Sequence, residues 1–209
     1  KTHIQSGLSS ETTIYNSRQE PIKKIDAEGH ETHISYAYGQ INHIGQRVTV
    51  IDIKDPLGQC TLQELDVFGR VFKEECYGEG KLLSRKFNFY NPEGDLEMVR
   101  LDRIADGVIL ESLHHQWTYN PVHEVTHFTQ ALGSSQERHT HTHYNERGQK
   151  VALIKPDGVQ LYYAYDTLGR LHTLTSSDST IAYRYTYNNK DQVTLCEDLI
   201  SQQTTQRTY

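Results

Sequence analysis

The sequence predicts an all-β protein, an antiparallel meander of short hairpins that repeats along the whole chain. Tyrosine followed by asparagine or aspartate recurs along the chain and, with two related sites at Tyr36 and Leu65, gives intervals of 21 to 29 residues, which is typical of a repeat architecture. The segments between turns alternate with a period of two, and none has the periodicity of a long amphipathic helix. We therefore expect residues 1–209 to form one repeat region without a separate second domain.

The first repeating element begins with tyrosine and continues into a turn. It reads "YNSR", "YNPEG", "YNPVH", "YNERG", "YDTLG" and "YNNKD", beginning at Tyr15, Tyr90, Tyr119, Tyr144, Tyr165 and Tyr187. Two related sites fill the gap after Tyr15, namely Tyr36 in "YAYG" and Leu65 in "LDVFGRV". One further interval of 22 residues ends at Tyr209, as expected for a piece of a longer array.

A second set of turn signals lies between the first. Its members are "DAEG" at 26–29, "DPLG" at 55–58, "YGEG" at 77–80, "ADG" at 105–107, "LGSS" at 132–135, "KPDG" at 155–158 and "SSDS" at 176–179. Together the two sets reverse the chain about every 8–14 residues, as expected for consecutive hairpins.

The turn residues carry their own mechanism. In "DTLG" the aspartate side chain caps a type I turn, and the glycine takes the left-handed conformation that joins the returning strand. Six glycines of the two sets are assigned as structural repeat residues, namely Gly58, Gly69, Gly94, Gly148, Gly158 and Gly169. Aligning "YNPVHEV" with "YNPEGDL" puts His123 in the glycine position, and "YNNKDQV" puts Asp191 there. Both residue types tolerate positive φ.

The alternation assigns a different character to each face of the sheet. In "IAYRYTY", Tyr183, Tyr185 and Tyr187 share one face, while small and polar residues share the other. We expect the tyrosine face to pack against neighbouring strands or another layer. The opposite face, which carries His139, His141 and His143 in "RHTHTHY", should border a wetter space.

The segment "HEVTH" at 123–127 matches the H-E-x-x-H pattern of zinc peptidases. On a helix, His123 and His127 would bind zinc one turn apart, and Glu124 would activate a metal-bound water. The segment resembles the thermolysin-like peptidases, in which a later glutamate is the third ligand, and Glu146 lies at a suitable distance.

The same segment has a second interpretation as a hairpin. Pro121 and the β-branched Val125 and Thr126 give it weak helix propensity, although proline can also begin a helix. The repeat instead predicts a turn at 120–123 followed by a strand, and it makes Glu146 a turn residue. We favour the hairpin, keep the zinc peptidase as an alternative, and expect no catalytic residue or cofactor.

The three histidines of "RHTHTHY" are a second group of side chains that could bind a metal ion. Alternate residues of a strand lie about 6.5–7 Å apart, so two imidazoles there could share a zinc ion. The favoured interpretation is a solvated strand face without metal, on which protonation adds positive charge as the pH falls below about 6.5.

Composition excludes several classes of partner. The net charge is −6 and no basic run occurs, so nucleic acid is not expected. No window is apolar enough for a membrane span, and the opening residues lack the pattern of a secretory signal. Cys60, Cys76 and Cys196 have no metal-ligand spacing, which predicts ordinary thiols or at most one disulfide.

Two strings carry a family resemblance. "DPLGQCTLQELDVFGRV" and "KPDGVQLYYAYDTLGRL" each hold two glycines 11 residues apart and a closing glycine followed by Arg70 or Arg170. They resemble the YD repeats of the rearrangement-hotspot (RHS) family, which includes bacterial polymorphic toxins, toxin-complex C components and the animal teneurins. The resemblance is weak before residue 50, and the family's autoproteolytic aspartate region has no counterpart here.

The resemblance implies a ribbon of β-hairpins that spirals into a hollow shell. By resemblance, this chain would be a structural shell segment of a secreted or exported RHS-type protein, and its partners would be the rest of that protein and an enclosed toxin domain. A glycan- or receptor-binding adhesion module, using exposed aromatic side chains of the sheet, is a further alternative.

Overall fold

The computed structural model describes residues 2–6 and 9–209, which fold into β-strands and connecting turns. No helix occurs among these residues, so the all-β prediction is confirmed, and none is present that could cross a membrane. The predicted lack of a secretory signal rests partly on residues 1, 7 and 8, which lie outside this description. The chain divides into two compact units, Lys1–His114 and His115–Tyr209.

The first unit is an antiparallel meander in which each strand pairs with its neighbour in the chain. Its strands are β1 (Thr2–Ser6), β2 (Ser9–Tyr15), β3 (Pro21–Ile25), β4 (Glu31–Ile41), β5 (Arg47–Lys54), β6 (Cys60–Leu65), β7 (Val71–Gly78), β8 (Lys81–Tyr90) and β9 (Leu96–Ala105). The next strand, β10 (Val108–Tyr119), begins in this unit and pairs with β9.

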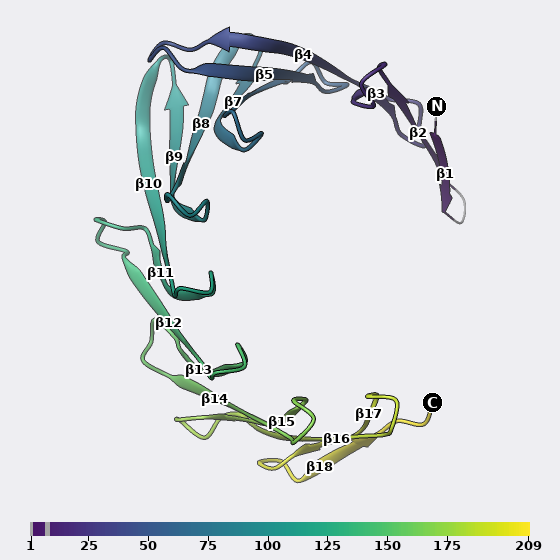
Figure 1. Cartoon of the computed structure of the whole chain (residues 1–209), viewed down its shortest axis with the longest axis vertical. Coiled ribbons are helices and arrows are strands. Elements are labelled where there is room, and N and C mark those ends of the chain that lie inside the picture. The colour runs from purple at the N-terminus through teal and green to yellow at the C-terminus, as the bar shows by residue number, and fades with distance from the viewer. Residues whose placement is uncertain (1, 7–8) are drawn as a thin grey trace. The chain divides into compact units, whose positions relative to one another are not determined.

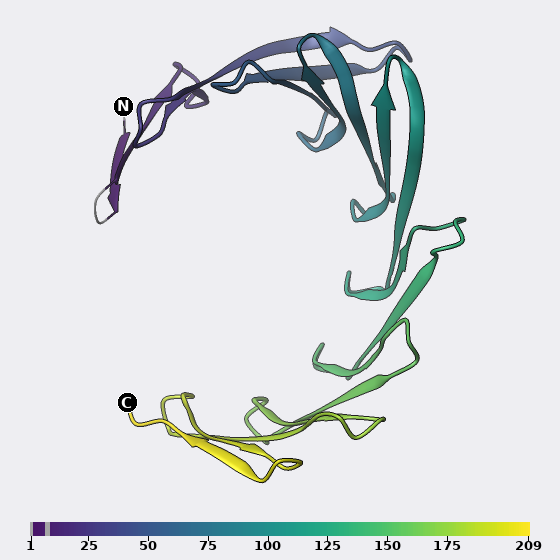
Figure 2. The same cartoon turned by 180° about the vertical axis from the view of Figure 1, so that it is seen from behind.

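The second unit continues the same pattern from the end of β10. Its further strands are β11 (Val125–Gln130), β12 (Arg138–Tyr144), β13 (Lys150–Ile154), β14 (Gln160–Tyr165), β15 (Leu171–Ser176), β16 (Ala182–Tyr187), β17 (Val193–Asp198) and β18 (Gln203–Gln206). Within each unit the strands lie side by side in chain order as a single layer (Figures 1 and 2). The predicted antiparallel meander is therefore confirmed.

Asparagine and aspartate hold the turns closed through their side chains. Asp66 Oδ1 accepts hydrogen bonds from the backbone N–H groups of Phe68 and Arg70, both at 2.9 Å, and the Gly69 N–H donates to the Asp66 carbonyl at 3.0 Å. The same pattern recurs at Asn16, Asp26, Asn42, Asp55, Asn120, Asn145, Asp166 and Asn188. Each turn therefore satisfies its own backbone donors without help from a second layer.

The last turn position requires a left-handed backbone. Gly69 has φ +78°, where a Cβ would cost steric energy in most residue types. The other glycines assigned as repeat residues share this conformation, namely Gly58, Gly94, Gly148, Gly158 and Gly169. His123 and Asp191 occupy the equivalent positions with φ +64° and +60°.

The predicted turn at "YAYG" is wrong. β4 runs through Tyr36 to Ile41, and the ladder register shifts between Ala37 and Gln40, where Gly39 has φ +64°. The chain reverses six residues after Tyr36, at 42–45. The reason is the cap: "NHIG" begins with Asn42, whose side chain closes the turn, whereas "YAYG" has no such residue.

A single layer leaves little to bury. Among the described residues the buried apolar side chains are Val48, Val99, Ile104 and Ala131, and no large side chain is fully buried. The surface area is 14180 Å², against about 10,000 Å² expected for a compact protein of 24.1 kDa. The fold is therefore held mainly by backbone ladders, turns and contacts between adjacent strands.

The two faces differ as the alternation predicts. On β16, Tyr183, Tyr185 and Tyr187 are half-buried against neighbouring strands, while Arg184 and Thr186 are exposed. On β12 the exposed residues include His139, His141 and His143. The three cysteines are free thiols, in agreement with one of the two outcomes that their spacing allowed.

We predict that Gly69→Val destabilises the chain by about 1–2 kcal/mol, because a β-branched residue resists positive φ. A Cβ at this position meets nothing within 4 Å, so the cost is one of backbone conformation and not of crowding. Gly69→Asn should cost distinctly less, since asparagine tolerates this region. Urea unfolding of both variants measures the difference, and equal losses would contradict the turn assignment.

Candidate functional site

In six places a tyrosine hydroxyl bonds the backbone at the exit of an earlier turn. Tyr165, the last residue of β14, donates a hydrogen bond of 2.8 Å to the carbonyl of Lys150, the first residue of β13. The same bond joins Tyr36 to Pro21, Tyr90 to Val71, Tyr144 to Val125, Tyr187 to Leu171 and Tyr209 to Val193, at 2.7–3.2 Å. We call this recurring contact the tyrosine clamp.

The clamp connects two successive turns on one edge of the sheet. The turn at 145–148 leads into Lys150, and the turn at 166–169 follows Tyr165, so the hydroxyl ties the exit of one turn to the start of the next. Burial raises the pKa of Tyr165, as it does for Tyr36, Tyr144 and Tyr187. These hydroxyls therefore remain protonated donors throughout the physiological range.

The other predicted repeat residues hold the corresponding places. Tyr15, Leu65 and Tyr119 are the last residues of β2, β6 and β10. The ladder register shifts directly before each of them, as it does before Tyr90 and Tyr165. A bulge of this kind re-aims the side chain at the end of the strand, which places the repeat residue over the turn edge.

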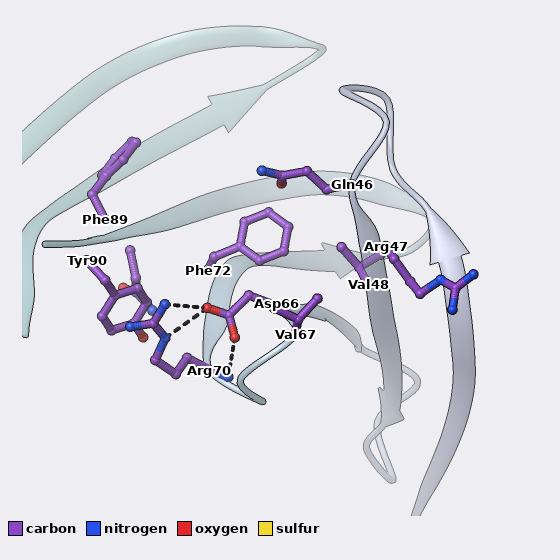
Figure 3. Close-up of a pocket in the computed structure, with 10 residues that line it drawn as sticks. Gln46, Arg47, Val48, Asp66, Val67, Arg70, Phe72, Phe89 and Tyr90 are labelled. Atoms are coloured by element: carbon purple, nitrogen blue, oxygen red, sulfur yellow. Dashed lines mark hydrogen bonds and ion pairs between the residues drawn. The ribbon is translucent and has the colours of Figure 1, made fainter. Parts of the chain in front are cut away.

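Arg70 links neighbouring turns in the first unit. Its guanidinium bonds Asp66 Oδ2 at 2.8 Å from Nε and 2.7 Å from Nη2, and it lies 4.3 Å from the ring centroid of Tyr90. Figure 3 shows these side chains beside a hollow of about 460 Å³ that Phe72 and Val48 also line. The arginine thus stacks on the clamp tyrosine of a later repeat.

Arg170 repeats this arrangement in the second unit and extends it. It bonds Asp166 at 2.7 and 2.8 Å and lies 4.6 Å from the ring centroid of Tyr187. Its Nη1 also donates to the Asn188 carbonyl at 3.2 Å and to Asp191 Oδ1 at 2.8 Å. The Arg170 side chain therefore bonds the cap of its own turn and the backbone and side chain of the turn at 188–191, and it also covers the Tyr187 ring.

The H-E-x-x-H segment does not form the helix that a zinc peptidase requires. The Asn120 amide donates to the Glu124 carbonyl at 3.0 Å, and the His123 amide donates to the Asn120 carbonyl at 3.0 Å, which closes a turn. His127 then lies within β11. Because His123 and His127 are separated by a turn exit and a strand, they do not lie one helical turn apart.

The carboxylates of the peptidase alternative are turn residues. Glu124 Oε2 accepts a hydrogen bond of 2.7 Å from the Asn120 side chain, and Glu146 lies in the turn at 145–148. Glu124, Glu146 and His127 line one hollow of about 550 Å³, together with His141 and His143. Across residues 2–6 and 9–209, no three His, Cys, Asp or Glu side chains are arranged to hold a metal ion.

The histidines of β11 and β12 form a cluster that spans both strands. His127 Nε2 lies 3.1 Å from His139 Nδ1, and the His127 ring stacks on that of His141 at 4.1 Å and 14°. Burial lowers the pKa of His127, and the neighbouring His141 and His139 lower it further. The predicted histidine face is therefore joined by a residue from the peptidase motif, a link that only the strand register creates.

Sequence reasoning placed the repeat tyrosines and arginines but missed their contacts. It assigned the tyrosines to a packed face, whereas their hydroxyls bond backbone carbonyls about 15–20 residues earlier. It treated Arg70 and Arg170 only as repeat markers. The signal was available in the string "DxxGR", in which an acidic residue precedes an arginine by four positions.

We predict that Tyr165→Phe destabilises the chain by about 0.5–1.5 kcal/mol, the usual value of a hydrogen bond whose loss leaves the ring in place. Tyr162→Phe is the matched control, because its exposed hydroxyl bonds only the side chain of Gln160. Chemical unfolding of both variants tests the clamp. A loss no greater than that of the control would show that the clamp does not contribute.

We predict that His123→Gly is tolerated, with a change in unfolding free energy within about 1 kcal/mol, because glycine adopts the left-handed turn conformation without strain. His123→Val should be clearly destabilising, since valine resists the same conformation. Thermal unfolding of the two variants checks this. A destabilising glycine would indicate that the imidazole, and not the backbone, determines this position.

No family model and no curated protein matches the sequence. The chain is similar to a solved TcdB2–TccC3 structure, with 15% identity and a TM-score of 0.48 over 92% of this chain and 12% of that chain. A TcdB2–TccC3 structure without its hypervariable C-terminal region gives 15% identity and a TM-score of 0.44, over 92% and 11%. A Photorhabdus luminescens Tc holotoxin pore gives 11% and 0.43, over 91% and 13%. The chain thus spans only 11–13% of the length of these solved chains.

Proposed function

We propose that this chain is a wall segment of an RHS-type, YD-repeat shell that encloses or carries a toxin domain. The observation that carries the proposal is the tyrosine clamp, which recurs in both units and whose acceptor is in every case the carbonyl of the first residue of a strand. A contact that joins each repeat only to its neighbour suits a structure built by adding identical units.

The lack of a core supports a structural part within a larger protein. A sheet with one layer cannot bury both faces by itself, and stable domains pack at least two layers. Very few apolar side chains of the described residues are buried, so the segment needs contacts from outside itself. An enclosing wall would obtain them from the rest of the protein.

The third residue of the four-residue turns indicates more specifically where the segment contacts a partner. Large apolar side chains stand there with exposed fractions of 63–85%, at Ile44, Leu57, Phe68, Val122 and Leu168. Other turns carry Glu93, Arg147 or Lys190 at this position. Exposed apolar side chains on a soluble protein favour contact with a partner, here the remainder of the RHS-type protein or its enclosed toxin domain.

The rest of the proposal follows from the RHS resemblance. The parent protein would be secreted or exported, and this segment would have no catalytic residue of its own. The clamp tyrosines, the turn glycines and the two arginines would serve as structural repeat residues. Their role would be to fix the spacing of the hairpins and so the curvature of the wall.

We predict that the isolated 209-residue chain associates in solution, because its sheet has unpaired edges and exposed turn tips. Size-exclusion chromatography with light scattering measures this. Phe68→Ser combined with Leu168→Ser should reduce association, whereas Glu93→Ser combined with Arg147→Ser, at the same turn position, should not. In the full-length parent, limited proteolysis should leave the segment intact and protect the enclosed domain.

Two outcomes would contradict the wall proposal. One is an isolated chain that remains monomeric and stable at high concentration, with no effect of the Phe68 and Leu168 substitutions. The other is a parent protein in which protease removes this segment without exposing any other domain. Either result would favour a self-sufficient binding module over a wall.

A further inference from the structure

Two imidazole nitrogens and one hydroxyl oxygen from β11 and β12, all of which can donate a lone pair to a metal ion, lie close together on one face of the sheet. His127 Nε2 and His139 Nδ1 lie 3.1 Å apart, and Thr129 Oγ1 lies 3.4 Å from the first and 3.3 Å from the second. The register explains the convergence, because Thr129 pairs directly with His139 and His127 lies two residues away on the same face. The three atoms form a nearly equilateral triangle.

This triangle has the dimensions of one face of a tetrahedral metal site. Zinc binds imidazole nitrogen at about 2.0–2.1 Å, which separates two ligands of a tetrahedron by about 3.3 Å. The observed nitrogen-to-nitrogen distance of 3.1 Å needs only a small adjustment to match. A metal ion above the triangle would contact both imidazole nitrogens at bonding distance.

A carboxylate sets the tautomer that metal binding requires. Glu137 Oε1 lies 3.1 Å from His139 Nε2, so this nitrogen carries the proton and donates it to the carboxylate. The Nδ1 lone pair of His139 is then directed toward His127. Metal-bound histidines commonly donate their other N–H to a carboxylate, which orients the ring and increases its basicity.

Neighbouring side chains hold the His127 ring in place and leave the His139 ring accessible to solvent. The His127 ring is stacked on His141, and Thr129 is only 4% exposed. The His139 side chain is 47% exposed, so an ion can approach from solvent. The site therefore combines a fixed ligand with an open side.

We propose that His127 Nε2 and His139 Nδ1 chelate one divalent transition-metal ion, Zn²⁺, with the Thr129 hydroxyl beside it and water in the remaining positions. On binding, the His127 proton moves from Nε2 to Nδ1, so both ligands stay neutral. Imidazole also suits Cu²⁺ and Ni²⁺ but not the oxygen-seeking Ca²⁺ and Mg²⁺. The site is an open chelate without a third His, Cys, Asp or Glu ligand, and it is independent of the wall role.

Calorimetric titration of ZnCl₂ into the 209-residue chain, prepared without a polyhistidine tag, tests the site. We expect one ion per chain and at least a tenfold weaker affinity in His127→Ala or His139→Ala. His143→Ala is the matched control, because it lies on the same face of β12 and outside the triangle. Glu137→Gln should weaken binding about 10–100-fold while it retains both ligands.

NMR of the unaltered chain provides a measurement that does not depend on the folding of any variant. Zinc should shift the ring-proton signals of His127 and His139 together and leave those of His143 unchanged. The proposal is overturned if zinc produces no such shift, or if His127→Ala and His139→Ala bind zinc as tightly as the His143→Ala control.

Discussion

The hydrogen bond from a repeat tyrosine to a backbone carbonyl is the contact on which the rest of the structure depends. In a protein with two packed layers, side-chain burial between the layers stabilises the sheet, but here each unit has one layer and few buried apolar residues among those described. The tyrosine clamp provides additional stabilising contacts at the edge of the sheet where the turns lie. A single such bond contributes about 0.5–1.5 kcal/mol, so stability comes from its repetition and not from any one copy.

The clamp works only because the turns bring its partners into position. A capping Asn or Asp and a left-handed residue such as Gly169 close these turns, and a register shift lies directly before the tyrosine at the end of the preceding strand. Arg70 and Arg170 then cover the tyrosine rings and bond the capping aspartates. At Asp166, Gly169, Arg170 and Tyr187 the cap, the left-handed residue, the arginine and the tyrosine therefore act together.

The histidine cluster shows what the same scaffold allows on its solvent-facing side. A residue from the H-E-x-x-H segment and a residue from "RHTHTHY" become neighbours because β11 pairs with β12 in one particular register. A shift by a single residue would place His127 on the opposite face from His139. The ladder thus decides which of the scattered histidines can act together.

The all-β meander, the positions of most turns and the left-handed conformation at Gly69 and His123 could be predicted from the amino-acid sequence, because they follow from local turn chemistry and a period of two. It did not determine where the chain reverses after Tyr36, since a bulge in β4 and a cap at Asn42 compete over a few residues. The bonds from tyrosine hydroxyls to earlier carbonyls and the contact between His127 and His139 became visible only in the folded chain. Both contacts join residues more than ten positions apart, and strand register, which local sequence does not encode, sets their distance.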